Sequence, residues 1–242
     1  MREKVKMRKI AQAIEKFFSS RKDKKIDPLD ILIATILSQN TNDLNSAKAF
    51  ENLKARFPRF EDIINADVKQ IEEAIKIGGL AHQKAVRIKK LLTELKEKVG
   101  RLDLSFLSKI SVEEGIKFLT TFKGVGLKTA SCVLLFGFNK DVFPVDTHIH
   151  RILNRVGVVK TKTPDETFHK VKNLIPSGSA YVLHTGLIKF GRLICRARNP
   201  LCGVCPIYSI CKFRDKKFFK DKSKGLGLKL TKKGEFILLD EI

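Results

Sequence analysis

The chain has 242 residues, 43% of them hydrophobic, and 48 basic against 26 acidic residues give a net charge of +22. This length and apolar content suit one domain or two small ones and argue against disorder. We expect an intracellular protein without a secretory signal or membrane span, because no apolar run reaches the ~18 residues of a spanning helix. The charge favours a monomer that binds nucleic acid, although a lysine-rich solvated surface, common in proteins from hot environments, gives the same balance.

Helical periodicity dominates the chain, and strand signal is almost absent before residue 225, so we predict an all-α fold. The opening helix presents apolar residues on one face, and Asp27-Pro28 after the charged linker starts the next helix. The segment 82–99 places apolar and basic positions on opposite faces, and Ser111 with Glu114 forms a capping box. The last stretch, 225–242, alternates and predicts a small β-hairpin. The other expected helices cover 31–39 (apolar all round and therefore buried), 46–57, 60–66, 67–77, 111–122, 127–138, 145–159, 165–175 and 177–195.

The most informative segment runs from residue 122 to 151, FKGVGLKTASCVLLFGFNKDVFPVDTHIHR. Gly124 and Gly126 permit backbone dihedrals that let amides close on a phosphate, and the following helix N-terminus favours the same anion. Lys128 lies in the first turn of that helix. Asp146 lies at or near the N-cap of the next one. The segment therefore offers a phosphate grip, an amine and a carboxylate.

Four of the five cysteines crowd together with the spacing C-x6-C-x2-C-x5-C. In an intracellular protein such clustering favours a metal over disulfides. Four thiolates suit either structural zinc or an iron–sulfur cluster. The fifth, Cys132, lies in an apolar helix and is expected in the core.

The ordered set GVGLKTA, FPVDTHIHR and CRARNPLCGVCPIYSIC resembles the helix-hairpin-helix DNA glycosylases, and among them the endonuclease III group, over about residues 5 to 213. The resemblance implies two helical lobes with a DNA-binding cleft between them. A helical bundle would span 28–138 and end in the helix-hairpin-helix motif, and residues 1–27 with 139–213 would form the iron–sulfur domain. Residues 214–242 would form a basic C-terminal extension, whose role the resemblance leaves open.

The implied activity is that of a bifunctional DNA glycosylase and abasic-site lyase of base excision repair, acting on oxidised pyrimidines in double-stranded DNA. Lys128 would form a Schiff base with the sugar, and Asp146 would stabilise developing positive charge. Relatives that excise adenine or mismatched thymine typically lack the lysine. The alternatives are a mismatch-specific or monofunctional glycosylase of the same fold and a non-catalytic DNA-binding module.

The resemblance also implies DNA contacts and cluster ligands. The hairpin would grip a phosphate, aided by a monovalent cation, through Lys123, Gly124, Val125 and Gly126. Either Gln39 or Asn40 would fill the gap left by the flipped nucleotide, Leu80 would wedge against the opposite strand, and His148 is either a backbone contact or a helix-surface residue. A [4Fe-4S] cluster would be held by Cys195, Cys202, Cys205 and Cys211.

Overall fold

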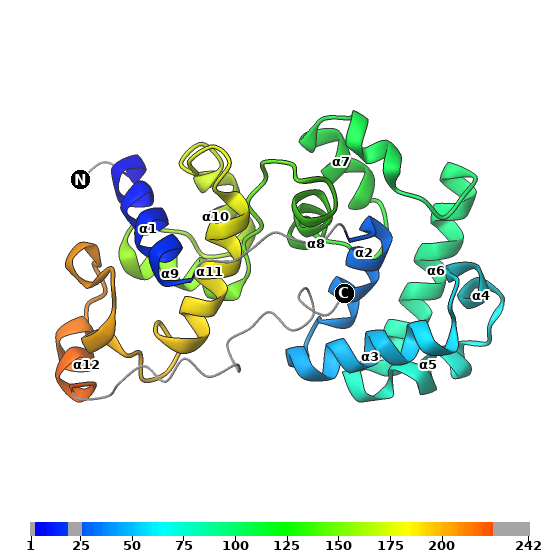
Figure 1. Cartoon of the computed structure of the whole chain (residues 1–242), viewed down its shortest axis with the longest axis horizontal. Coiled ribbons are helices and arrows are strands. Elements are labelled where there is room, and N and C mark those ends of the chain that lie inside the picture. Colours follow the sequence, from blue (N-terminus) through cyan, green and yellow to red (C-terminus); the bar gives the residue numbers. More distant parts are fainter. Residues whose placement is uncertain (1–2, 19–25, 225–242) are drawn as a thin grey trace. The chain divides into compact units, whose positions relative to one another are not determined.

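The computed structural model describes residues 3–18 and 26–224, which fall into two compact units (Figure 1). Of the described residues, 26–140 form the bundle unit, and 3–18 with 141–224 form the terminal unit. Every regular element in the described ranges is a helix, which confirms the all-α prediction. The β-hairpin expected at 225–242 lies outside these residues. In the same ranges, no helix combines the length and apolar character that a membrane crossing requires.

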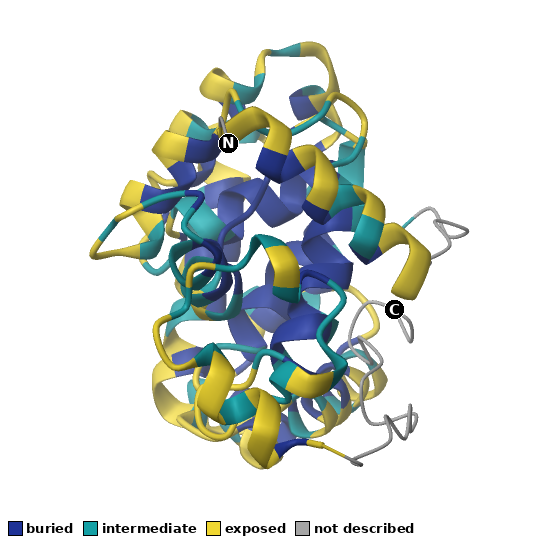
Figure 2. Ribbon diagram, turned by 90° about the vertical axis from the view of Figure 1, so that its left-hand side faces the viewer, coloured by how far each residue is buried: buried dark blue, intermediate teal, exposed yellow. Residues whose placement is uncertain are grey.

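In the described residues, the bundle unit is a continuous stretch of chain arranged around one buried helix. The apolar α2 is buried along most of its length, as its composition predicts, and the buried residues of the neighbouring helices complete the core. Figure 2 colours the described residues by burial, with buried residues in dark blue. Its helices are α2 (Pro28–Leu37), α3 (Asp43–Arg56), α4 (Phe60–Asn65), α5 (Val68–Ile75), η1 (Lys76–Gly78), α6 (Ala81–Val99), η2 (Ser105–Lys109), α7 (Val112–Leu119), α8 (Leu127–Cys132) and the π turn η3 (Val133–Gly137).

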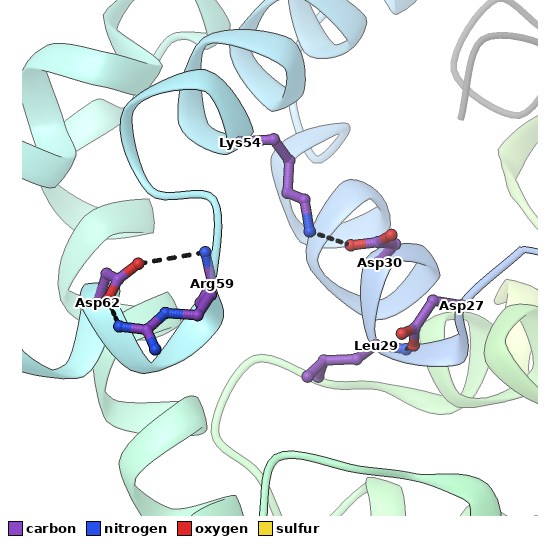
Figure 3. Close-up of polar contacts among 6 residues, drawn as sticks. All are labelled: Asp27, Leu29, Asp30, Lys54, Arg59 and Asp62. Carbon is purple, nitrogen blue, oxygen red and sulfur yellow. Dashed lines mark hydrogen bonds and ion pairs between the residues drawn. The ribbon is translucent and has the colours of Figure 1, made fainter.

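Local polar contacts fix the helix starts in this unit. Asp27 caps α2 through a 2.8 Å hydrogen bond, and the predicted capping box before α7 is present. Lys54 of α3 pairs with Asp30 of α2 at 3.0 Å, and Arg59 pairs with Asp62 at 2.9 Å at the start of α4 (Figure 3). These pairs are partly or fully exposed, so each stabilises the fold only modestly.

The helix predicted over 127–138 is present, and its second half has π rather than α geometry. After α8 the chain widens into the π turn Val133–Gly137, whose residues are buried apart from the last. Gly137 lies against Pro28, where an added Cβ would come within 3.0 Å of the proline ring. The π geometry thus coincides with the close contact between this turn and α2.

The prediction that apolar and basic positions of 82–99 lie on opposite faces is wrong at two positions, the exposed Val86 and the buried Lys84. Lys84 is only 2% exposed and shares the buried side of α6 with Ala85 and Ile88. Its Nζ donates to the carbonyls of Leu37 at 2.7 Å and Gly78 at 2.8 Å. These carbonyls satisfy the ammonium, and periodicity alone does not reveal partners so far away in sequence.

The terminal unit joins the first helix to the last third of the chain. The apolar face of α1 packs against α11 so closely that a Cβ on Gly186 would lie 2.3 Å from Ile14. Lys6, 4% exposed, donates to the carbonyls of Val156 and Gly157 at the end of α9, at 2.9 and 3.0 Å. The helices are α1 (Glu3–Phe17), α9 (Thr147–Val156), α10 (Pro164–Val171), α11 (Ala180–Leu193), η4 (Cys202–Val204), η5 (Tyr208–Ile210) and α12 (Lys216–Lys222), the last of which the sequence did not predict.

Candidate functional site

The turn between α7 and α8 is a tight hairpin. The Val125 amide donates to the Phe122 carbonyl at 3.0 Å and closes it. Gly124 has a φ of +91°, which side chains rarely adopt, whereas Gly126 is extended and caps α8. Val125 is buried and anchors the turn, while Lys123 faces solvent. The turn therefore has a fixed shape, and at the exposed Gly126 no side chain covers the backbone.

Lys128 lies in the first turn of α8, directly behind the hairpin, and is half-buried. Its ammonium group makes no hydrogen bond or ion pair with any residue in the ranges 3–18 and 26–224. By contrast, Lys84 in the same unit uses its ammonium to hold two buried carbonyls. The side-chain nitrogen of Lys128 thus has no partner among the described residues. The first turn of α8 holds the backbone of Lys128 in place.

Asp146 belongs to the terminal unit and caps α9, as predicted. Its Oδ1 accepts a hydrogen bond from the Ile149 amide at 2.8 Å, while Oδ2 accepts none from the described residues. The preceding segment is buried, and His184 donates through Nδ1 to the Pro144 carbonyl at 2.9 Å. Contacts on both sides of Asp146 in the sequence therefore hold its backbone in place. Its Oδ2 remains available for another partner.

Gln39 and Asn40 follow the end of α2 and differ sharply in their surroundings. Gln39 donates through Nε2 to the Gly124 carbonyl at 3.2 Å and accepts at Oε1 from Nη1 of Arg87 at 2.7 Å. Asn40 is exposed, has a φ of +55° and has no hydrogen-bond partner among the described residues. The Gln39 side chain is therefore hydrogen-bonded within the bundle unit, whereas Asn40 projects from a turn with a left-handed backbone.

Leu80 lies in the turn between η1 and α6 of the bundle unit. It precedes α6 with a φ of +50° and is 49% exposed, both unusual for a leucine. The chain before it is fixed by Lys84, whose Nζ holds the Gly78 carbonyl. A rigid turn therefore presents an apolar side chain to solvent, as a wedge requires.

His148 is placed inside the terminal unit, against α11. A Cβ on Gly191 would lie 2.9 Å from the His148 Cβ, so the ring packs closely on that helix. Nη2 of Arg151 donates to Nδ1 of His148 at 3.1 Å and to the Cys195 carbonyl at 2.9 Å. Burial is the main cause that lowers the pKa of His148, so the ring is neutral near pH 7. Arg151 thus links the helix that Asp146 caps to the first of the clustered cysteines.

The four clustered cysteines line one pocket in the terminal unit. Arg155 donates to the carbonyls of Arg196 and Ala197 and lies 3.7 Å from the Cys195 sulfur, while its guanidinium stacks 4.5 Å from the ring of Phe213. In the described part of the chain, no three His, Cys, Asp or Glu side chains are grouped to hold a single metal ion. Four thiols around one pocket match the donor set of an iron–sulfur cluster.

The thiol chemistry also fits such a cluster. Burial raises the pKa of Cys202 to about 11 and that of Cys205 to about 12, and it raises the pKa of Cys211 as well. Without iron these thiols hold their protons, which cluster binding must displace. The set supplies the four sulfur donors that a [4Fe-4S] cluster takes.

The helix α12 packs directly on the cysteine loop. Nζ of Lys216 donates to the carbonyls of Tyr208 at 3.1 Å and Cys211 at 2.6 Å. The buried Ser223 accepts from the Gly203 amide at 2.8 Å, and a Cβ on Gly203 would lie 2.9 Å from its hydroxyl. The start of the C-terminal extension therefore supports the loop that carries the cysteines.

Sequence reasoning missed the cations that join these segments. Lys84, Arg87, Arg151 and Arg155 act through carbonyls or side chains far away along the chain. The available signal was local: a lysine and an arginine, one turn apart, flank the apolar residues of α6. A basic residue beside a buried stripe indicates a structural partner, although it does not identify one.

Comparison with protein families gives two matches. The profile of the HhH-GPD superfamily of base excision DNA repair proteins matches residues 33–177. The profile of the iron–sulfur binding domain of endonuclease III matches residues 195–211, which begin and end at the first and last clustered cysteines.

Individual relatives agree with these profiles. A proposed DNA glycosylase of Arabidopsis thaliana is 45% identical over 166 residues, which are 68% of this chain and 57% of that protein. Endonuclease III of Thermotoga maritima is 38% identical over 204 residues, 84% of this chain and 91% of that protein. Among solved structures, a non-covalent endonuclease III–DNA complex superposes with a TM-score of 0.77 at 28% identity, covering 89% of this chain and 97% of that chain. A trapped endonuclease III–DNA covalent intermediate has a TM-score of 0.76, again at 28% identity, with the same coverage of both chains.

Proposed function

Because this chain belongs to the HhH-GPD superfamily of base excision DNA repair proteins and is a DNA glycosylase that carries a [4Fe-4S] cluster, we propose that it is bifunctional and that Lys128 is its nucleophile. The observation that carries this proposal is the amine of Lys128, which has no partner among the described residues and lies directly behind the glycine hairpin. A trapped covalent intermediate of a protein with the same fold supports the same chemistry.

In the proposed reaction, the neutral amine of Lys128 attacks C1′ of the flipped nucleotide and the base departs with the electrons of the glycosidic bond and a proton. The sugar ring then opens at O4′ and leaves a protonated Schiff base on the lysine. Loss of a C2′ proton expels the 3′ phosphate by β-elimination. The free oxygen of Asp146 would stabilise positive charge at C1′ and relay protons.

The remaining residues would bind and orient the DNA or hold the cluster. We propose phosphate contacts from Lys123, Gly124, Val125 and Gly126, with a monovalent cation at the hairpin, gap filling by the turn at residues 39–40, and a wedge at Leu80. The neutral, packed ring of His148 suits a positioning role better than a charged phosphate contact. When bound by Cys195, Cys202, Cys205 and Cys211, the cluster would order their basic loop and take no part in bond chemistry.

We propose oxidised pyrimidines in duplex DNA as the lesions and a monomer as the active form, since the high positive charge disfavours self-association. The functional domains would be the bundle at 28–138 and the cluster domain at 1–27 with 139–213, followed by the extension at 214–242.

Borohydride trapping on duplexes with one abasic site tests the nucleophile. Wild type should form a covalent adduct, Lys128→Ala should form none while still binding DNA, and Lys123→Ala, which removes the neighbouring exposed lysine, should still be trapped at saturating enzyme. A trapped Lys128→Ala variant would refute the assignment. Duplexes with thymine glycol, uracil opposite guanine, or adenine opposite 8-oxoguanine would then decide the lesion class; excision of only the last two would overturn the pyrimidine proposal.

A further inference from the structure

The two adjacent residues after α2 have separate roles in the bundle unit. Both polar ends of the Gln39 amide are engaged, with the Gly124 carbonyl at 3.2 Å and the Arg87 guanidinium at 2.7 Å. A side chain that fills the space of a departed nucleotide needs its donor and acceptor free for the DNA. Only Asn40, exposed and unpaired among the described residues, meets that condition.

The bridge is also sterically tight at the hairpin. A Cβ on Gly124 would lie 2.3 Å from Cδ and 2.4 Å from Nε of Arg87, so the arginine stem rests on the hairpin backbone. Any shift of Arg87 therefore moves its partner Gln39 or the hairpin itself. Arg87 is therefore connected to the hairpin in two ways. Its stem packs on Gly124, and its guanidinium bonds to Gln39, which in turn bonds to the Gly124 carbonyl.

The same helix supports the neighbouring turns. Lys84, three residues before Arg87 on α6, holds the carbonyl of Leu37 at the end of α2 and that of Gly78 before the Leu80 turn. The exposed turn at Asn40, the turn at Leu80 and the hairpin are thus fixed to one side of one helix, all within the bundle unit.

We propose that Gln39 and Arg87 are positioning residues that hold the Asn40 turn in register with the phosphate-gripping hairpin. The inference rests on the proposed function, since that function gives the turn and the hairpin their tasks on DNA. Pre-organised spacing strengthens binding only where both elements are engaged, at a lesion. Binding to undamaged duplex depends on charge and needs no such register.

The test compares affinities for a duplex carrying a tetrahydrofuran abasic analogue and for the same duplex undamaged. Gln39→Met and Arg87→Met should each lower the preference for the analogue by about tenfold, and the double variant should lose no more than either alone, because they break one shared bridge. Lys90→Met is the matched control, since it removes an exposed charge from the same helix. It should weaken both duplexes equally and leave the preference unchanged.

Gln39→Glu provides a second variant that keeps an acceptor for Arg87 while losing the donor to the Gly124 carbonyl. It should fold, as checked by circular dichroism, and still lose the preference. Additive losses in the double variant, or a wild-type preference in Gln39→Glu, would overturn the bridge and leave the proposed function standing. A wild-type protein with neither preference nor borohydride adduct would instead reject the proposed function, and this inference with it.

Discussion

Replacing Gly124 with alanine should destabilise the bundle unit by about 2–3 kcal/mol. A left-handed backbone, here with φ of +91°, costs a residue with a Cβ about 1–2 kcal/mol. The new Cβ would lie 2.3 Å from Cδ of Arg87, so the arginine must move and lose its 2.7 Å hydrogen bond to Gln39. That loss adds about 1 kcal/mol.

Gly126→Ala is the matched control from the same hairpin. Gly126 has an extended backbone with φ of −91°, and no atom lies within 4 Å of an added Cβ. Its stability should stay within about 0.5 kcal/mol of wild type. Both variants place a methyl group on the hairpin, so a stability difference between them reports the Arg87 contact and the backbone strain rather than any effect on DNA.

Urea unfolding followed by far-ultraviolet circular dichroism measures the difference. Gly124→Ala should unfold at a lower urea concentration than both wild type and Gly126→Ala, with an unchanged slope if only stability has changed. Equal midpoints for the two alanine variants would show that Arg87 does not rest on the hairpin backbone, and would refute the reasoning.

Three other outcomes follow from the terminal unit. Lys6→Met should lower its stability by about 2–3 kcal/mol, because two carbonyls at the end of α9 lose their donor, and a thermal shift below 1 °C would contradict this. Burial lowers the pKa of His148 below the ~6.5 of an unfolded chain, so acid favours the unfolded chain as pH falls through that value. Acid unfolding should thus begin at higher pH in wild type than in His148→Gln, and identical midpoints would count against the packed ring. Lys216→Met should speed loss of the cluster's visible absorbance under a chelator relative to Lys217→Met, which removes an exposed neighbour; equal rates would show that α12 does not protect the loop.

Local signals in the sequence were sufficient for most helices. The Asp27-Pro28 start, the Ser111 capping box and the N-cap at Asp146 all depend on residues within one turn, and each is confirmed. The helix predicted over 127–138 is confirmed, but its π geometry over Val133–Gly137 was not foreseen; there Gly137 packs on Pro28, more than a hundred positions earlier. The short, charged α12 was missed because its stability comes from contacts with the cysteine loop rather than from its own pattern.

In the candidate site, too, local sequence predicted some features, whereas others depend on contacts between distant residues. The hairpin glycines and Lys128 are neighbours in sequence, and the spacing of the cysteines indicated a metal centre before any coordinates. Gln39 and Asn40 are adjacent and polar, so sequence alone could not separate them. What separates them is Arg87, 48 positions away, and only the folded chain brings that guanidinium to one of the two.

The terminal unit is assembled from both ends of the chain, and this has a consequence for its synthesis. Lys6 reaches a carbonyl 150 positions later, and α1 packs against α11, whereas the described residues of the bundle unit form one continuous stretch. A growing polypeptide therefore contains all the described residues of the bundle unit before α11, the helix against which α1 packs, has been synthesised. The folded protein buries three apolar side chains of α1 completely, those of Met7, Ile10 and Ile14. These side chains stay exposed to solvent through most of translation. The apolar face of the first helix is therefore exposed on the nascent chain until α11 has been synthesised.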